Sequence, residues 1–430
     1  MKKLLTLTAI GVVLASNAYS SGFHLKEQSV SALGNAFAGA TAGAEDISYS
    51  YFNPAGITRH KGSQVVFGTT YVAPKSKVSN VSAGIPSAPG DSNPGGWIPD
   101  TNLQGKDIIK NAAIPNFYAS KQLNEDFTIA MALNSPIGMI TKYDNSWAGR
   151  LHGTLSNVKT YTFTPTVAYK VDEKVSIAAG LQIQHITARL RNAVNVGAGP
   201  VTGRAALEGE ATDLGYVLGV MYEYSDKTRF GLGYRSRIKH KLKGDLDVYA
   251  PSGTPLVYGR DINARITTPA LLSIGAYHDV NDKWSVMAEL QRTYWETFKE
   301  LRIYNDAGGV ASQTDEMWKN TMFYAVGTSY KINDQWKVKA GLGFDKSAVK
   351  KQFKTPRVPD SDRNWYSLGA QYAYSENLAF DFGYTFIKAK KGKVILNGLT
   401  PGDVAGGRGS IDAQYDSKVH IFGAAVTYKF

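Results

Sequence analysis

The chain has 430 residues with 43 Gly, 25 Tyr, 17 Phe and no Cys, and Lys plus Arg exceed Asp plus Glu by 12. The absence of cysteine excludes a disulfide framework, a thiolate metal site and a cysteine nucleophile. A mean hydropathy of −0.24 excludes a polytopic helical membrane protein, which needs repeated apolar runs of about 20 residues. The many aromatic residues and glycines favour strands over helices.

The first twenty residues have the pattern of a secretory signal peptide. Met1-Lys2-Lys3 is basic, Leu4–Ala15 is apolar, and the small residues Ala18 and Ser20 suit cleavage after Ser20. A membrane anchor is the alternative, but this apolar stretch is too short to cross a bilayer. Export without cysteine is typical of a bacterial envelope, where oxidising conditions make free thiols a liability.

The rest of the chain alternates between apolar and small or polar residues with a period of two. Near the C-terminus, one face of such a segment carries Phe422, Ala424, Val426, Tyr428 and Phe430. A strand with one apolar aromatic face and one small polar face suits a barrel wall between lipid and a polar lumen.

Six short polar turns join these segments, and each places Asn, Asp or Ser where its side chain can cap a tight turn. The turns are Leu123–Asp126, Val171–Lys174, Tyr224–Lys227, Val280–Lys283, Ile332–Gln335 and Tyr374–Asn377. Six turns alternating with seven longer loops predict fourteen strands. We expect these strands to begin near residues 63, 115, 126, 157, 174, 210, 227, 260, 283, 319, 335, 363, 377 and 417.

The pattern predicts an all-β fold, a 14-stranded antiparallel transmembrane β-barrel of the outer-membrane type. A soluble chain of two β-sandwich domains would also alternate, but it does not explain the regular difference between short turns and long loops. We expect interfacial aromatic girdles to include Trp284, Trp336, Trp365 and Tyr428.

Residues 21–62 differ from the rest of the chain, because they are rich in Gly, Ala and Ser. Val30, Leu33 and Phe37 have helical spacing, and Asn53-Pro54 predicts a turn. We interpret this segment as a hatch, or plug, inside the barrel, since a barrel of this size leaves room in its lumen. A periplasmic extension or linker is the alternative. The predicted domains are a signal peptide (1–20), a hatch (21–62) and a barrel with long extracellular loops (63–430).

Short segments along the whole chain carry a recognisable pattern. They are Gly22–Leu25, Ser31–Ala36, Asn53–Ala55, Pro136–Gly138, Trp147–Arg150, Thr164–Tyr169, Tyr234–Ser236, Trp284, Pro356–Arg363 and Tyr428–Phe430. The most specific are Asn53-Pro54-Ala55 and the Pro-Arg-x-Pro-Asp-x-Asp-Arg block of Pro356–Arg363. With these residues the chain resembles the outer-membrane transporter family for long-chain fatty acids and aromatic hydrocarbons (FadL/TodX type).

The resemblance implies a monomeric barrel that captures its ligand among extracellular loops and holds it in an apolar pocket. A hatch movement then releases the ligand through a lateral opening at a kinked third strand. By position, Asn53, Pro54 and Ala55 would form the hatch kink, and Gly138 the kink in the wall. Gly138 could also be an ordinary glycine at the start of a loop.

A carboxylate head group needs a basic partner, and Arg189 and Arg191 lie in the region where the family binds it. Both, however, share a strand face with Ile177 and Leu181, which should meet lipid. Either a bulge reverses the register, or these arginines bind lipopolysaccharide phosphates.

A second basic stretch alternates strictly through Arg235, Arg237, Lys239, Lys241 and Lys243. A ligand funnel is possible for this face. Contact with anionic lipopolysaccharide is the favoured interpretation.

Enzymatic motifs are absent, with neither H-E-x-x-H nor G-x-S-x-G in the sequence, and we expect no enzyme activity, cofactor, metal or nucleic-acid partner. The expected partners are a hydrophobic small molecule, outer-membrane lipid and lipopolysaccharide. An aromatic-hydrocarbon channel, a general diffusion porin and an adhesin or phage-receptor role remain alternatives.

Overall fold

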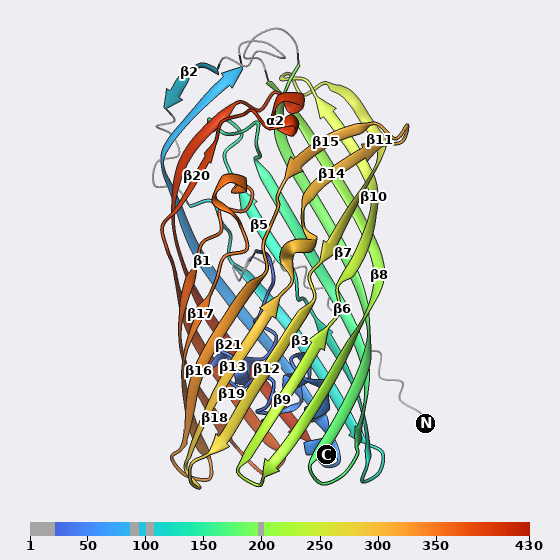
Figure 1. Cartoon of the computed structure of the whole chain (residues 1–430), viewed down its shortest axis with the longest axis vertical. Coiled ribbons are helices and arrows are strands. Elements are labelled where there is room, and N and C mark those ends of the chain that lie inside the picture. Colours follow the sequence, from blue (N-terminus) through green and yellow to red (C-terminus); the bar gives the residue numbers. More distant parts are fainter. Residues whose placement is uncertain (1–21, 87–93, 100–106, 197–201) are drawn as a thin grey trace, which may run out of the picture.

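The computed structural model describes residues 22–86, 94–99, 107–196 and 202–430. These residues form a closed antiparallel barrel of fourteen strands, with the N-terminal segment inside it (Figure 1). The predicted fold class is therefore confirmed. The expected signal peptide, residues 1–20, lies outside the described residues.

Eight wall strands are continuous and six consist of two segments each. The continuous ones are β1 (Ser63–Pro86), β3 (Ala112–Gln122), β6 (Leu155–Lys170), β7 (Val175–Asn195), β8 (Thr202–Ser225), β17 (Trp336–Asp345), β18 (Arg363–Ala373) and β21 (Ser410–Lys429). The interrupted ones are β4 (Phe127–Asn134) with β5 (Gly138–Lys142), β9 (Thr228–Arg235) with β10 (Ile238–Tyr249), β11 (Pro255–Thr268) with β12 (Leu271–Asp279), β13 (Trp284–Thr293) with β14 (Glu300–Asn305), β15 (Val310–Asp315) with β16 (Thr321–Lys331), and β19 (Leu378–Ala389) with β20 (Gly392–Leu396). The additional β2 (Pro94–Pro99) pairs with the outer end of β1.

The first and last strands close the barrel. β1 and β21 pair from Gln64 opposite Lys429 to Gly84 opposite Ser410. This ladder leaves no open sheet edge at the closure, as a barrel in lipid requires.

The short turns are held by the capping residues expected from the sequence. In the first turn, Oδ1 of Asn124 accepts hydrogen bonds from the backbone N–H groups of Asp126 (3.0 Å) and Phe127 (2.8 Å). Asp172, Asn281, Asn333 and Ser375 accept equivalent bonds in four further turns. These turns lie at the end of the barrel that also carries the C-terminus (Figure 1).

Six of the seven strands that begin on the opposite, long-loop side start earlier than expected, whereas β18 begins at residue 363 as expected. β8 begins at residue 202 against an expected 210, β15 at 310 against 319, and β21 at 410 against 417. Their outer ends project beyond the apolar band and have mixed polarity, so the period-two signal fades there although the ladder continues.

The outward faces are apolar and exposed, as the alternation predicts. Trp284, Trp336 and Tyr428 are exposed on the wall, which suits the girdle assignment. Trp365 was wrongly placed there, because it is fully buried and faces the lumen against Phe37. Its parity is that of Ser367 and not of the outward Tyr366, so the alternation itself favours the inward face.

The helical segments are short, and among the described residues no helix is long and apolar enough to cross a membrane. The N-terminal segment contains α1 (Val30–Leu33), η1 (Ile47–Tyr51) and η2 (Pro54–Arg59); the loops contain η3 (Trp295–Thr297), η4 (Lys351–Phe353) and α2 (Pro401–Gly406). The expected helix through Phe37 ends early, because Ala36 and Phe37 adopt positive φ values of 53° and 61°. Phe37 is nevertheless buried in the core that the hatch shares with the wall.

Candidate functional site

The N-terminal segment 22–62 lies inside the half of the barrel that carries the short turns (Figure 1), and most of its side chains are buried. Its backbone touches the wall at glycines. A Cβ added at Gly231 would overlap the carbonyl group of Thr41. One added at Gly341 would overlap that of Asn35. Four further wall glycines lie close to its backbone, namely Gly219, Gly233, Gly275 and Gly369, and two lie against the side chains of Val30 and Leu33, namely Gly383 and Gly423. We call these eight residues the glycine belt.

Buried charges also attach this segment to the wall. The Lys339 ammonium lies 2.6 Å from Glu45 and 3.6 Å from Asp381, and it donates a hydrogen bond of 2.6 Å to the Ser31 hydroxyl. Burial by itself would raise the pKa of Glu45, but the ammonium groups of Lys337 and Lys339 outweigh it and lower this pKa to about 2. Glu45 is therefore held as a carboxylate.

The Asn53-Pro54-Ala55 turn connects the segment to β8. The side-chain Oδ1 of Asn53 accepts a hydrogen bond of 3.0 Å from the N–H of Ala55 and caps η2, in which Pro54 occupies the first turn. The Asn53 amide donates to the backbone oxygens of Thr41 (2.8 Å) and Val220 (2.9 Å). Ala55 is fully buried. The predicted turn is present. Through Asn53 it connects to Thr41 within the hatch and to Val220 in the wall.

The other end of the segment pairs with an interruption in the third wall strand. Between β4 and β5 the wall leaves the ladder over residues 135–137. The N–H of Leu25 donates to the Pro136 oxygen (2.8 Å), and the N–H of Gly138 donates to the Phe23 oxygen (3.0 Å). The N-terminal segment thus forms an isolated antiparallel β-bridge, His24 opposite Ile137, with the kinked wall.

Gly138 itself stands beside the kink. It is the first residue of β5, pairs in register with Lys159, and is not among the described residues with positive φ. Pro136 accounts for the interruption more directly, because proline has no N–H to donate to a ladder.

The kink opens a recess in the wall. β3 pairs with β4 only from Phe117 onward, so Ala112–Asn116 face no strand on that side. The recess has a volume of about 310 Å³. Its outer lip consists of exposed apolar side chains, namely Phe67, Leu133 and Tyr161.

An apolar cluster fills the lumen beyond the hatch. Phe23 inserts among Trp295, Phe298 and Trp318 with ring-centroid distances of 4.7, 5.7 and 5.3 Å. Ile137 from the kink belongs to the same cluster. The N-terminal segment therefore links the apolar interior directly to the interrupted wall.

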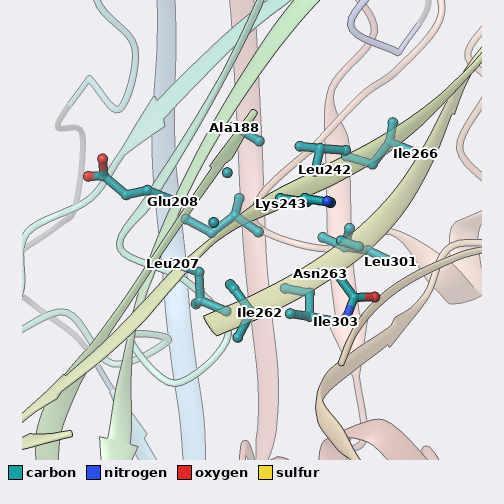
Figure 2. A pocket seen from close by; sticks show the side chains of 14 residues that line it. Ala188, Leu207, Glu208, Leu242, Lys243, Ile262, Asn263, Ile266, Leu301 and Ile303 are labelled. Carbon is teal, nitrogen blue, oxygen red and sulfur yellow. The ribbon is translucent and has the colours of Figure 1, made fainter. Parts of the chain in front are cut away.

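The cluster continues into an aliphatic pocket formed by β7, β8, β10, β11 and β14. Figure 2 shows Leu207, Leu242, Ile262 and Ile303 gathered around it, whereas the Glu208 carboxylate points away. Its cavity volume of about 30 Å³ is that of a single water molecule. An acyl chain would enter only if these side chains moved.

The Pro356–Arg363 block, known from the sequence only as a signature, attaches an outer loop to the hatch. Oδ2 of Asp360 accepts hydrogen bonds from the N–H of Gly22 (3.2 Å) and from the Ser347 hydroxyl (2.8 Å), and Arg363 forms an ion pair with Asp360. The loop therefore holds the beginning of the described chain. Sequence reasoning missed Phe23, Glu45, Lys339 and Asp360 as individual residues, because each acquires its contact only across the lumen.

Arg189 and Arg191 are not brought to the lumen. Both side chains are exposed on the outer face of β7, and Arg189 pairs with Glu208 at 3.1 Å. The β7–β8 ladder is continuous from Val175 to Asn195, so no bulge reverses the register here.

A register reversal occurs instead between β9 and β10. Arg235 is buried and donates to the backbone oxygen of Tyr51 (3.0 Å) and to Oε1 of Gln182 (2.7 Å). Arg237, Lys239, Lys241 and Lys243 are exposed. The expected single basic face was thus wrong at Arg235, because the ladder is interrupted at residues 236–237.

We expect Gly341→Ala to displace the hatch, because its Cβ would meet the Asn35 backbone and overpacking of this kind costs about 1–3 kcal/mol. Planar-bilayer conductance should rise as the lumen opens. Gly209→Ala is the matched control, since the nearest atom to its Cβ lies 3.3 Å away on β10. An unchanged conductance for Gly341→Ala would contradict the role of the glycine belt.

We expect acid to loosen the hatch through Glu45. Its folded-state pKa of about 2 lies below the ordinary 4.5. The stabilisation is therefore present above pH 4.5 and is lost as the pH falls toward 2. Protease cleavage within residues 22–62 should increase over that window in the wild type. Glu45→Gln should be more sensitive at pH 7, and the two proteins should converge near pH 2; parallel curves would refute the assignment.

Comparisons with known proteins agree with this arrangement. A family model described as "Outer membrane protein transport protein (OMPP1/FadL/TodX)" matches residues 11–430. The chain is 26% identical to "Long-chain fatty acid transport protein" of Salmonella typhi over 459 residues, covering 100% of this chain and 99% of the relative. It is also 26% identical to "Outer membrane protein P1" of Haemophilus influenzae, covering 99% of each.

Solved structures share the fold. A Pseudomonas aeruginosa FadL homologue superposes with a TM-score of 0.85 at 24% identity, covering 95% of this chain and 100% of that chain. The CymD monoaromatic hydrocarbon channel superposes with a TM-score of 0.65 at 15% identity, covering 95% and 98%. With the family model matching nearly its whole length, this chain belongs to the OMPP1/FadL/TodX family of outer-membrane transport proteins, which carry hydrophobic molecules and are not enzymes.

Proposed function

We propose that this protein takes up long-chain fatty acids or similar hydrophobic molecules, with residues 21–62 acting as a movable hatch. The observation that carries the proposal is the pairing of Phe23 and Leu25 with the kinked wall beside an open recess. In this scheme residues 1–20 are removed on export. The mature chain acts as a monomer in contact with membrane lipid and lipopolysaccharide.

The route begins among the extracellular loops and continues into the apolar cluster around Phe23 and Trp318. Burial contributes roughly 0.8 kcal/mol per CH₂, so an acyl chain of about 16 carbons gains on the order of 10 kcal/mol as an upper bound. Such affinity would trap the ligand unless a conformational step released it. Withdrawal of Phe23 from the cluster supplies that step, because the same segment is paired with the wall at the recess.

Release is then lateral, through the recess and into the membrane. Asn53, Pro54 and Ala55 keep the rest of the hatch attached to β8 while its N-terminal end moves. Gly138 is the first residue of the wall beyond the opening. A general diffusion porin is disfavoured, because the hatch and the apolar cluster fill the lumen.

An aromatic-hydrocarbon channel is the second candidate. The rings of Trp295, Phe298 and Trp318 surround Phe23 in edge or tilted contacts. Aromatic pairs of this kind gain about 0.5–1.5 kcal/mol beyond burial, so a substituted benzene could replace the Phe23 ring.

We expect a disulfide between His24→Cys and Ile137→Cys to block transport, because the two residues are opposite each other in an isolated antiparallel β-bridge. The disulfide would therefore fix the hatch to the kink. Uptake of oleic acid by cells producing this variant should be abolished when it is oxidised and restored by a reductant. Binding of oleic acid to the purified protein should persist in both states.

The matched control joins Ser285→Cys to Ser329→Cys, which are opposite each other on neighbouring wall strands. The natural chain has no cysteine, so each pair is unambiguous. Uptake that continues through the oxidised His24–Ile137 variant would refute hatch movement at this place.

The double variant Arg189→Ala, Arg191→Ala should leave oleic acid uptake unchanged, since both side chains lie on the outer face. We propose that they contact lipopolysaccharide phosphates, so the variant should instead lower the retention of lipopolysaccharide during purification. A selective loss of oleic acid binding would instead indicate that Arg189 and Arg191 bind the head group of the ligand.

A further inference from the structure

One buried polar side chain of the wall recess has no hydrogen-bond partner in the part of the chain that the structure describes. Asn116 lies on β3, at the last position before the β3–β4 ladder begins, and its side chain faces inward and lines the recess. It is 2% exposed. Among the described residues, neither its Oδ1 nor its Nδ2 has a hydrogen-bond partner.

The other buried polar side chains that line the recess have hydrogen-bond partners. Asn134 donates to the Tyr118 hydroxyl at 2.8 Å, the Ser135 hydroxyl donates to the Thr160 oxygen at 2.7 Å, and the Thr162 hydroxyl accepts from Gln184 at 2.9 Å. A buried amide without partners costs about 1–3 kcal/mol. Asn116 therefore has a hydrogen-bond donor and an acceptor that are both unused at the wall opening.

A glycine on the neighbouring wall strand leaves space for the Asn116 amide. Gly68 on β1 is directly opposite Asn116 in the β1–β3 ladder. A Cβ at Gly68 would lie 2.6 Å from Oδ1 of Asn116 and 3.3 Å from Ala425 on the other side. Any larger residue at this position would push the amide out of its place.

The recess carries no charge. None of its lining side chains, which include Phe67, Pro115, Phe117, Leu133 and Tyr161, is ionisable near neutral pH. An ionised carboxylate would lose its hydration here without gaining a cation, which is costly in an apolar setting. A neutral group with one donor and one acceptor fits this site better.

We propose that Asn116 is a head-group site for the protonated carboxyl of a fatty acid at the wall opening. Its Oδ1 accepts the acid O–H while its Nδ2 donates to the acid carbonyl, so that both partners are satisfied in a cyclic pair. The amide replaces the water that the head group loses and lowers the barrier to lateral passage. A hydrocarbon cannot make either bond. The inference rests on the proposed function and narrows it to carboxylic acids.

The test compares three probes in cells that lack their own fatty acid transporter and produce the full chain: oleic acid, methyl oleate and hexadecane. Asn116→Leu keeps the branched shape and the number of side-chain heavy atoms and removes both polar atoms. We expect uptake of oleic acid to fall roughly tenfold, as the loss of one to two hydrogen bonds implies. The fall in uptake should be smaller for methyl oleate, which can accept a hydrogen bond but not donate one. Uptake of hexadecane, which can do neither, should not change.

Gly68→Ala gives a second variant that moves the amide without removing it, and the same order of effects is expected. Phe117→Leu is the control, because it changes the apolar lining of the recess and should affect the three probes alike. Heat-modifiable migration on gels verifies that each barrel is folded.

Equal effects of Asn116→Leu on all three probes, or none, would overturn the head-group site while leaving lateral uptake intact. A wild-type protein that takes up none of the probes would instead refute the proposed function.

Discussion

The close approach of the hatch backbone to the glycine belt is the constraint on which the rest of the lumen depends. At Gly231 and Gly341 main chain lies against main chain, which no residue with a Cβ would permit. The side chains beside this contact are almost fully buried. The contact therefore brings Lys339 and Glu45 together in a buried setting, where an ion pair is strong and the loss of either partner is costly.

The two ends of the hatch are held differently, and the difference suits the proposed mechanism. From Ser31 to Ala55 the segment is attached through the glycine belt, buried ion pairs and the Asn53 amide. At its N-terminal end it is attached by main-chain bonds to a kink, by the aromatic side chain of Phe23, and by the bond from Gly22 to Asp360. An apolar ligand can replace the aromatic contact of Phe23, but it cannot replace the ion pair between Lys339 and Glu45.

Much of the wall followed from local chemistry. Turn residues such as Asn124 and Asn333 form the expected side-chain bonds, because an Asx turn needs only neighbours two and three residues away. Period-two alternation correctly placed the outward aromatics Trp284 and Tyr428. It failed at Arg235, since a ladder interruption reverses the register and is invisible to a pattern that assumes an unbroken strand. Asn116 was not noticed, because an unpartnered amide is defined only by its surroundings.

The sequence by itself determined the barrel, the number of its strands, which connections are short turns, and the family. These features depend on periodicity, turn chemistry and the order of motifs. The tertiary structure decided which residues meet across the lumen. It placed Asp360 against Gly22, turned Arg189 outward, and opened the wall where Pro136 leaves the ladder. The physical reason is that such contacts join residues far apart in the chain, such as Gly22 and Asp360, and only closure of the barrel brings them within bonding distance.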